Sequence, residues 1–282
     1  MTTIAVTGAT GTVGGLTARH LADEAAGEGH DVRLLVRDPD RAPDLGFALW
    51  RCAYDEGPAL REALAGVDAL LFVSGHESAD RMADHASVVE AAVDAGVGHV
   101  VYTSFVGASA DSTFTLGRDH GATEDLLRDS GLGWTFLRDN FYAEVFPHFA
   151  DAEGVIRGPA GQGRVAAVSQ RDVAAVAGRV LQDPGAHVGR AYDLTGPQAL
   201  TLDEVAATLT EVTGRPHRFH DETEAEARES RAHYGAPDWQ LDAWISTFTA
   251  IRDGELAAVS GDVERVLGRP ATAVADALRP TV

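Results

Sequence analysis

Short apolar runs recur through the first half of the chain, separated by longer segments in which apolar residues follow helical spacing. Each run stops at a glycine, a serine or an arginine, and such bounded apolar runs predict buried strands. The predicted strands are Thr3–Thr7, Asp31–Val36, Ala69–Val73, His99–Thr103 and Trp134–Leu137. The predicted helices between and after them are Val13–Ala26, Pro58–Ala65, Ala83–Ala95 and Ala122–Ser130.

This alternation predicts the fold class. Continuously apolar strands that alternate with helices are typical of a parallel sheet covered by helices on both faces. Right-handed crossovers then produce an α/β, doubly wound parallel sheet of the Rossmann type.

The second half of the chain has a different pattern. Gly154–Gly163 is rich in glycine and predicts a loop, and Asp172 fits the N-cap of a helix over Val173–Leu181. A late strand is expected at Ala191–Leu194. Thr201 and Glu204 have the T-x-x-E spacing of a capping box. Further helices are expected within residues 221–231, which are highly charged, and over Trp239–Ile251.

These later segments predict a smaller, mainly C-terminal α+β domain that covers the substrate. The dinucleotide-binding domain is expected to comprise residues 1–140 plus about 165–195. The substrate-covering domain is expected to comprise about 141–164 plus 196–282.

Composition excludes several classes of function. The 282 residues carry 23 basic and 43 acidic side chains, a net charge of −20, which disfavours nucleic acid and anionic membranes as partners. All the basic residues other than histidine are arginine, so no lysine can serve as a nucleophile or base. With a lone cysteine, Cys52, and no apolar stretch near about 18 residues, we expect a cytoplasmic protein with a small-molecule substrate. The sequence is compatible with a homodimer and with a monomer.

The most informative motif is the GxxGxxG loop that follows the first strand and opens the first helix. Gly8 permits the tight turn, Gly11 lets the backbone approach a pyrophosphate, and Gly14 lets the helix pack on the strand. The alternative is a glycine turn without a ligand. The expected pyrophosphate-binding residues are Gly8, Thr10, Gly11, Thr12 and Val13.

The residue after the second strand bears on the choice of cofactor. Arg37 is placed to contact the 2′-phosphate of NADP, because guanidinium groups bind phosphate through two hydrogen bonds. Asp38 is its neighbour, and an acidic residue here accepts ribose hydroxyls in NAD sites. NADP is therefore the predicted cofactor, with NAD as the alternative.

Ligands of such sheets bind beyond the carboxyl ends of the strands. Ser74 and Gly75 follow one predicted strand and Ser104 follows another, and all three are expected to contact the cofactor. The alternative for Ser104 is a purely structural role, in which its hydroxyl forms a hydrogen bond at the end of the strand. After the strand at Trp134–Leu137 come three expected substrate contacts: Asn140, Phe141 and Tyr142.

Several segments together suggest a family. They are TGATGTVGG near the N-terminus, VRDP after the second strand, YTS at 102–104, H-x-x-T-E at 120–124 and SGLGWTFLRDNFYAE at 130–144. With Asp172-Val173-Ala174 and the segment 259–268, they resemble the NmrA-like group of atypical short-chain dehydrogenases over nearly the whole chain. The bacterial type-2 NAD(P)H:quinone oxidoreductases look most similar.

The resemblance implies an NADPH-dependent oxidoreductase that transfers hydride to a quinone or a related carbonyl or enone. The superfamily's Tyr-x-x-x-Lys pair cannot exist here, and His120 takes the place of a lysine found in similar plant reductases. The resemblance therefore implies that His120 is the catalytic residue and a cofactor contact. The alternative is a non-catalytic NAD(P)-binding redox sensor of the NmrA type. A sugar epimerase fits poorly, because it needs a strong base.

Overall fold

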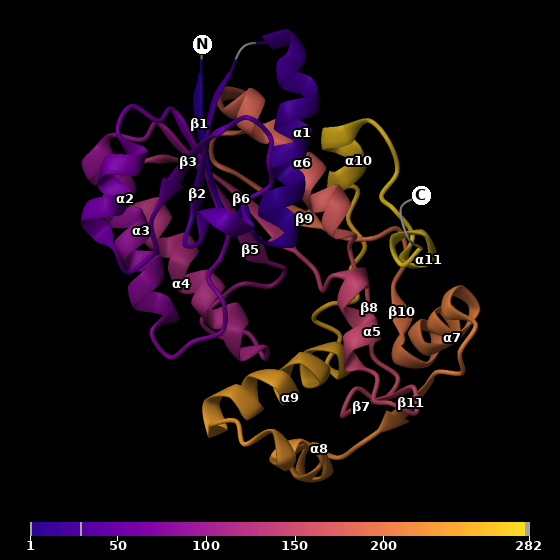
Figure 1. Ribbon diagram of the computed structural model, residues 1–282. Coiled ribbons are helices and arrows are strands. Elements are labelled where there is room, and N and C mark those ends of the chain that lie inside the picture. The colour runs from indigo at the N-terminus through magenta and orange to yellow at the C-terminus, as the bar shows by residue number, and fades with distance from the viewer. Residues whose placement is uncertain (1, 29, 280–282) are drawn as a thin grey trace. The chain divides into compact units, whose positions relative to one another are not determined.

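A seven-stranded sheet organises the N-terminal part of the computed structural model, which describes residues 2–28 and 30–279, with backbone only at 24–28 (Figure 1). The strand order is β3-β2-β1-β4-β5-β6-β9. The strands are β1 Thr3–Thr7, β2 Asp31–Val36, β3 Ala48–Arg51, β4 Ala69–Phe72, β5 His99–Phe105, β6 Gly133–Asp139 and β9 Arg190–Leu194. The order reverses between β1 and β4, and ligands of open α/β sheets bind beside such a reversal.

The sheet is parallel and covered on both faces. Figure 1 shows α1 and α6 on one side of it and α2, α3 and α4 on the other. These helices are α1 Thr12–Glu28, α2 Gly57–Leu64, α3 Arg81–Ala95, α4 Thr115–Asp129 and α6 Gln170–Gln182. The Thr17 hydroxyl on α1 donates to the Ala174 carbonyl on α6 across 3.4 Å. The doubly wound α/β prediction is confirmed.

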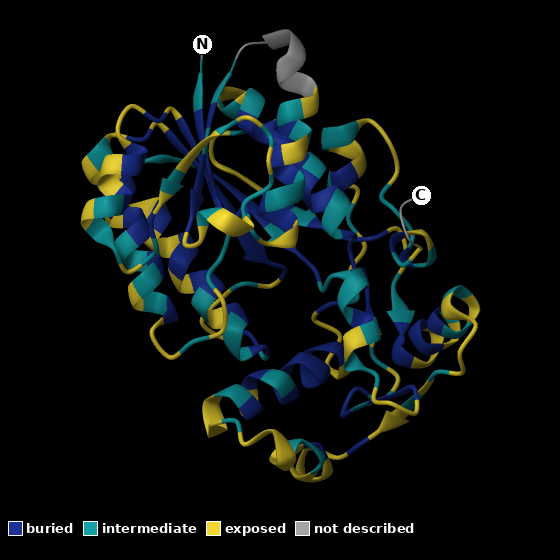
Figure 2. Ribbon diagram, viewed as in Figure 1, coloured by how far each residue is buried: buried dark blue, intermediate teal, exposed yellow. Residues whose placement is uncertain are grey.

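The chain forms two compact units, each with its own core. Unit 1 comprises Met1–Ser104, Gly121–Arg138 and Arg171–Tyr192; unit 2 comprises Phe105–His120, Asp139–Gln170 and Asp193–Val282. The central strands β1, β4 and β5 are buried along most of their length (Figure 2), because helices cover both faces of the sheet. The core of unit 1 includes the fully buried rings of Phe72, Tyr102 and Phe136. The domain limits expected from the sequence remain a prediction.

Unit 2 contains short strands and helices around a second core that includes Phe146, Ile156 and Phe248. Strand β8 pairs antiparallel with β10, and β7 pairs parallel with β11. The strands are β7 Val155–Gly158, β8 Arg164–Val165, β10 Leu200–Thr201 and β11 Arg218–Asp221. The helices are α5 Phe146–Phe149, α7 Leu202–Thr213, α8 Glu224–Arg231, α9 Asp238–Arg252, α10 Asp262–Leu267 and α11 Val274–Ala277.

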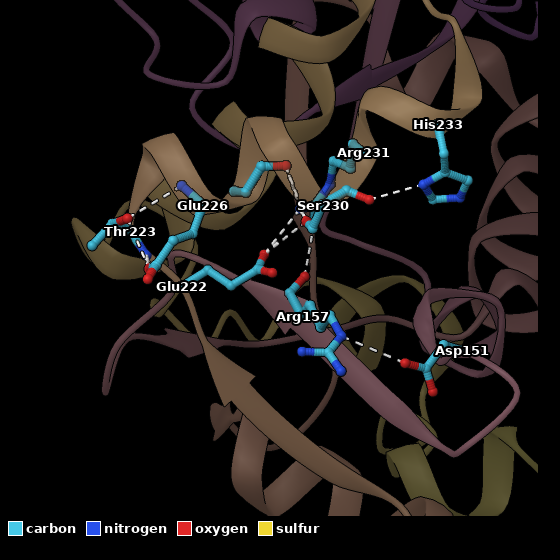
Figure 3. A network of polar contacts seen from close by, with 9 residues as sticks. Asp151, Arg157, Glu222, Thr223, Glu226, Ser230, Arg231 and His233 are labelled. Atoms are coloured by element: carbon cyan, nitrogen blue, oxygen red, sulfur yellow. Dashed lines mark hydrogen bonds and ion pairs between the residues drawn. The ribbon is translucent and has the colours of Figure 1, made fainter.

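The charged segment at 221–231 forms α8, and part of it is buried. The predicted capping box of Thr201 and Glu204 on α7 is present, and Thr223 and Glu226 form another on α8. Figure 3 shows how α8 is held to β7: Arg231 pairs with the buried carboxylate of Glu222 at 3.1 Å and donates to the Arg157 carbonyl at 2.7 Å. The highly charged segment is therefore only partly exposed to solvent.

Three local expectations were wrong or incomplete. The predicted loop at 154–163 contains β7, and β3 was not predicted, because its side chains are largely exposed and lack an apolar run. Asp172 is not the N-cap of α6, which begins earlier, at Gln170. Instead, Glu144 accepts the Gln170 N–H at 3.1 Å, a long-range contact that local sequence does not reveal.

Candidate functional site

The turn between β1 and α1 has the geometry of a phosphate-binding loop. Gly8 has φ +64°, a conformation that favours glycine, and its carbonyl accepts the Gly11 N–H at 2.8 Å. A Cβ on Gly14 would lie 2.5 Å from the Gly8 oxygen and 2.7 Å from the Thr7 oxygen. Helix α1 therefore packs against β1 at a distance that only glycine allows at this position.

The first turn of α1 presents its amides beyond the end of β1. The helix begins at Thr12, and Gly11 and Thr12 are exposed whereas Val13 is buried. The first N–H groups of a helix lack partners within it and bind anions well. Thr10 precedes them and is half-buried. These predicted pyrophosphate ligands are thus grouped at one end of α1, and their contact with a cofactor remains a prediction.

Arg37 follows β2 directly and is exposed. Within the described part of the chain, no carboxylate forms an ion pair with its guanidinium. Asp38, by contrast, is the N-cap of the short helix at Pro39–Arg41, and its carboxylate accepts the Asp40 N–H at 3.2 Å. The arginine is available to an external phosphate, while the aspartate has a local structural role.

The segment after β4 is fixed through its backbone. The Val73 N–H donates to the Thr7 hydroxyl oxygen at 2.9 Å, and the Val73 carbonyl accepts the Tyr54 hydroxyl at 2.5 Å. The Ser74 N–H donates to the hydroxyl oxygen of Thr103, on β5, at 2.8 Å. Side chains from several parts of unit 1 therefore orient the segment that holds the predicted cofactor contacts Ser74 and Gly75.

Two side chains of α3 complete this arrangement at Gly75. The Gly75 N–H donates to His85 Nε2 at 2.8 Å, and the Gly75 carbonyl accepts Arg81 Nε–H at 3.1 Å. Since a backbone N–H can only donate, Nε2 must be unprotonated, and the Nδ1–H of His85 faces the Thr123 hydroxyl at 2.8 Å. Burial, and then the charge of Arg81, lower the pKa of His85 to about 3, consistent with a neutral ring.

Replacing His85 by phenylalanine tests this assignment. The folded pKa lies below the ordinary 6.5, so the stability that the neutral ring contributes is present above pH 6.5 and is lost as pH falls. The variant leaves the Gly75 N–H unpaired, and we expect it to unfold about 1–3 kcal/mol more easily at pH 7. Between pH 7 and 5, wild type should lose about 2 kcal/mol more than the variant in urea titrations. Parallel losses would contradict the assignment.

Ser104 is the last residue of β5 that belongs to unit 1, and its hydroxyl proton is used in a hydrogen bond. It donates to Glu124 Oε1 at 2.7 Å, and the same carboxylate, fully buried, accepts two bonds from Arg138 and one from Arg128. With its proton directed at Glu124, the Ser104 oxygen is an acceptor for other donors. The strand-end hydrogen bond considered for Ser104 is present, and its contact with cofactor remains a prediction.

The residues expected near nicotinamide and substrate lie partly in unit 2. His120, on α4, is buried, with its ring 6.1 Å from the Phe105 ring. Phe105, Phe114 and Phe141 contact one another at centroid distances of 4.8–5.6 Å. These rings form an apolar aromatic wall in unit 2, with His120 at its edge. The catalytic assignment of His120 remains a prediction.

Asn140 and Tyr142 have partners within unit 2. The Asn140 amide donates to the Leu256 carbonyl at 3.0 Å and accepts the Phe141 N–H at 2.8 Å, so it stabilises the local fold. Its predicted substrate contact remains untested. The Tyr142 hydroxyl lies 2.7 Å from Oδ2 of Asp139, and both Phe141 and Tyr142 are half-buried.

Sequence reasoning missed Tyr54, His85 and Glu124 as supports of these sites. For His85 a signal existed: Met82, His85 and Val89 follow helical spacing, which places His85 on the buried face of α3. Residues 2–28 and 30–279 contain no group of three or more His, Cys, Asp or Glu side chains arranged to hold a metal. No helix in the same part of the chain is long and apolar enough to cross a membrane.

Known proteins resemble this chain over most of its length. The family model described as NAD(P)H-binding matches residues 8–184. Quinone oxidoreductase 2 of Escherichia coli is 34% identical over 281 residues, covering 98% of this chain and 97% of the relative. The crystal structure of NADPH-dependent quinone oxidoreductase from Escherichia coli, complexed with NADPH, has a TM-score of 0.88 at 33% identity and covers 98% of both chains.

A further solved structure extends the comparison to another acceptor. The triphenylmethane reductase of Citrobacter sp., complexed with NADP(H), has a TM-score of 0.84 at 32% identity and covers 98% of both chains. The expected resemblance to bacterial quinone oxidoreductases is confirmed. From the family model's match to more than half of the chain, and from identities above 30% over nearly all of it, this chain belongs to the NAD(P)H-binding family.

Proposed function

We propose that this protein is an NADPH-dependent oxidoreductase that transfers hydride to a quinone or a related carbonyl or enone acceptor. The observation that carries the proposal is the β1–α1 turn, in which Gly8 and Gly14 occupy positions where a side chain would strain or clash. Such turns bind the pyrophosphate of a dinucleotide through main-chain amides. The relatives named as NADPH-dependent quinone reductases support the acceptor class.

The residues present fit the cofactor. NADPH, when bound, supplies the hydride and its two electrons. The amides at the start of α1 hold the diphosphate, Arg37 binds the 2′-phosphate, and Ser74, Gly75 and Ser104 orient the rest of the cofactor. Phe141 and its aromatic neighbours in unit 2 exclude water from the acceptor, which favours a flat apolar ring system. His120 is proposed to contact the nicotinamide end.

The first test measures oxidation of NADPH by purified protein with a panel of quinones. Turnover with at least one quinone is expected. Tight binding of NADPH without turnover of any acceptor would favour the non-catalytic sensor instead. For that alternative, the solved structures of the regulator NmrA, at 16–17% identity, support only the fold. Failure to bind either dinucleotide would reject both functions.

Replacing Arg37 by alanine tests the cofactor preference. Loss of a charge-assisted contact to phosphate costs about 1.5–3 kcal/mol, so the Kd for NADPH should rise about 10- to 100-fold. The Kd for NADH should change little, because NADH lacks the 2′-phosphate. Arg61→Ala is the matched control, since that arginine, on α2, is paired at 3.2 Å with Asp94 of α3. An unchanged ratio of the two Kd values would reject the role of Arg37.

The partners follow from the same proposal. The substrate is a small molecule, and the net charge of −20 disfavours nucleic acid. We further propose a cytoplasmic location and a homodimer. Sedimentation of the purified protein tests whether it is a dimer. We also propose that unit 1 binds the dinucleotide and that unit 2 supplies the acceptor-covering residues.

A further inference from the structure

A buried carboxyl group ends β6 without a cation beside it. Asp139 is 2% exposed, and the Tyr142 hydroxyl donates to its Oδ2 at 2.7 Å. Its other oxygen, Oδ1, has no hydrogen-bond partner among the described residues, and no arginine or histidine of that set forms an ion pair with it. A buried charge without a partner is strongly destabilised, so this group favours its neutral form.

Glu124 shows the contrast within the same protein. Its equally buried carboxylate accepts bonds from Arg128, Arg138 and the Ser104 hydroxyl, so its negative charge is compensated. Arg138 and Asp139 are consecutive residues of β6, and side chains of consecutive strand residues point to opposite faces. Burial raises the pKa of Asp139 well above its ordinary value, and the Tyr142 hydroxyl opposes this only in part. Burial and the lack of a neighbouring cation therefore favour the protonated form of Asp139.

Tyr142 is held in place by its backbone and remains half-buried. The Phe141 carbonyl accepts the Val168 N–H, and the Val168 carbonyl accepts the Ala143 N–H, each at 2.9 Å. Tyr142 is therefore fixed between two backbone contacts to a neighbouring segment. It also follows β6 at the edge where ligands of this fold bind. A phenol on this edge, backed by a buried acid, has the arrangement of a proton donor with a reserve proton.

We propose that Asp139 and Tyr142 form a proton relay that serves the reduction of quinones. The inference rests on the proposed function. A quinone that gains a hydride becomes a hydroquinone monoanion and needs one proton. The Tyr142 hydroxyl, which donates to Asp139 Oδ2 in the structure, turns to the hydroquinone oxygen, where its O–H bond breaks and the proton is transferred. The Asp139 carboxyl then gives its own proton to the Tyr142 phenolate across the same 2.7 Å contact. After the hydroquinone leaves, a hydronium ion of the solvent returns one proton to the buried Asp139 carboxylate by way of the half-buried Tyr142 hydroxyl. The net reaction is quinone plus NADPH plus H⁺ to hydroquinone plus NADP⁺.

The relay predicts a dependence on the chemistry of the acceptor. A triarylmethyl cation dye becomes neutral when it takes up hydride, so its reduction requires no proton. The relay should therefore matter for a quinone and not for such a dye. A purely structural role for Asp139 or Tyr142 would affect both acceptors alike.

The experiment compares kcat for a water-soluble benzoquinone and a triarylmethyl cation dye, using Asp139→Asn, Tyr142→Phe and the double variant. We expect each single variant to lower kcat for the quinone about 100-fold and to leave kcat for the dye within about twofold. The double variant should be no slower than the slower single variant, because the residues act as a unit. Glu144→Gln is the control, since that carboxylate caps Gln170 and bonds Ser169; it should change neither rate.

Each outcome decides the matter. Equal losses with both acceptors, or no loss with the quinone, would overturn the relay while leaving the reductase function intact. If wild type reduces only the quinone, the variants are compared by three quantities. A lower kcat with an unchanged Kd for NADPH and an unchanged KM for the quinone supports the relay. A lower kcat together with a higher Kd and a higher KM overturns it. Absence of turnover with either acceptor in wild type would instead reject the proposed function.

Discussion

Replacing Gly14 by alanine is expected to abolish dinucleotide binding. The added Cβ would lie 2.5 Å from the Gly8 oxygen, 2.6 Å from the Gly8 carbonyl carbon and 2.7 Å from the Thr7 oxygen, and all three are backbone atoms that no rotamer change can move. Relief requires α1 to shift away from β1, which displaces the amides of its first turn. A charge-assisted hydrogen bond contributes about 1.5–3 kcal/mol, so loss of two such bonds to the diphosphate should raise the Kd for NADPH at least about 100-fold.

The measurement is the Kd for NADPH by fluorescence, together with the melting temperature. Gly178→Ala is the matched control, because Gly178 is also a buried helical glycine of unit 1 and its added Cβ would have its nearest contact at 3.4 Å, with the His20 side chain. The control should bind NADPH normally and should melt no earlier than wild type, since alanine favours helix over glycine. Tight binding by Gly14→Ala would show that the turn does not bind the cofactor.

The predictable part of the fold is the part governed by local patterns. Strands β1 and β2 coincide with the predicted apolar runs, because strands buried on both faces must be apolar throughout. Strand β3 could not be predicted in this way, since it lies at the edge of the sheet and is mostly exposed. The early start of α6 depends on Glu144, which is distant in sequence from the amide that it caps.

In the candidate site, too, local sequence predicts some residues, whereas others depend on the tertiary fold. The glycine turn and Arg37 are consecutive with their strands, so their placement follows from the sequence. The supports of Gly75 and Ser104 do not, because His85 and Glu124 reach them from helices that only the tertiary fold brings near. Glu124 and Arg128 have the spacing of an ordinary surface ion pair, and nothing local indicates that the carboxylate is fully buried.

Glu124→Leu is expected to cause the largest loss of stability among the substitutions considered. The carboxylate compensates Arg138, whose side chain is 25% exposed, and Arg128, at 37%. Breaking a buried ion pair costs about 3–5 kcal/mol, and we expect the lower end, about 3 kcal/mol, because water screens the two partly exposed arginines that remain. The free energy of unfolding, measured by urea titration, should fall by that amount, and the Ser104 hydroxyl should lose its fixed orientation.

The neighbouring Asp125 supplies the control. Asp125 also pairs with Arg128, at 2.7 Å, but its side chain is 73% exposed, so Asp125→Asn should cost less than about 1 kcal/mol. A loss for Glu124→Leu as small as that of the control would mean that solvent, and not Glu124, compensates the two arginines.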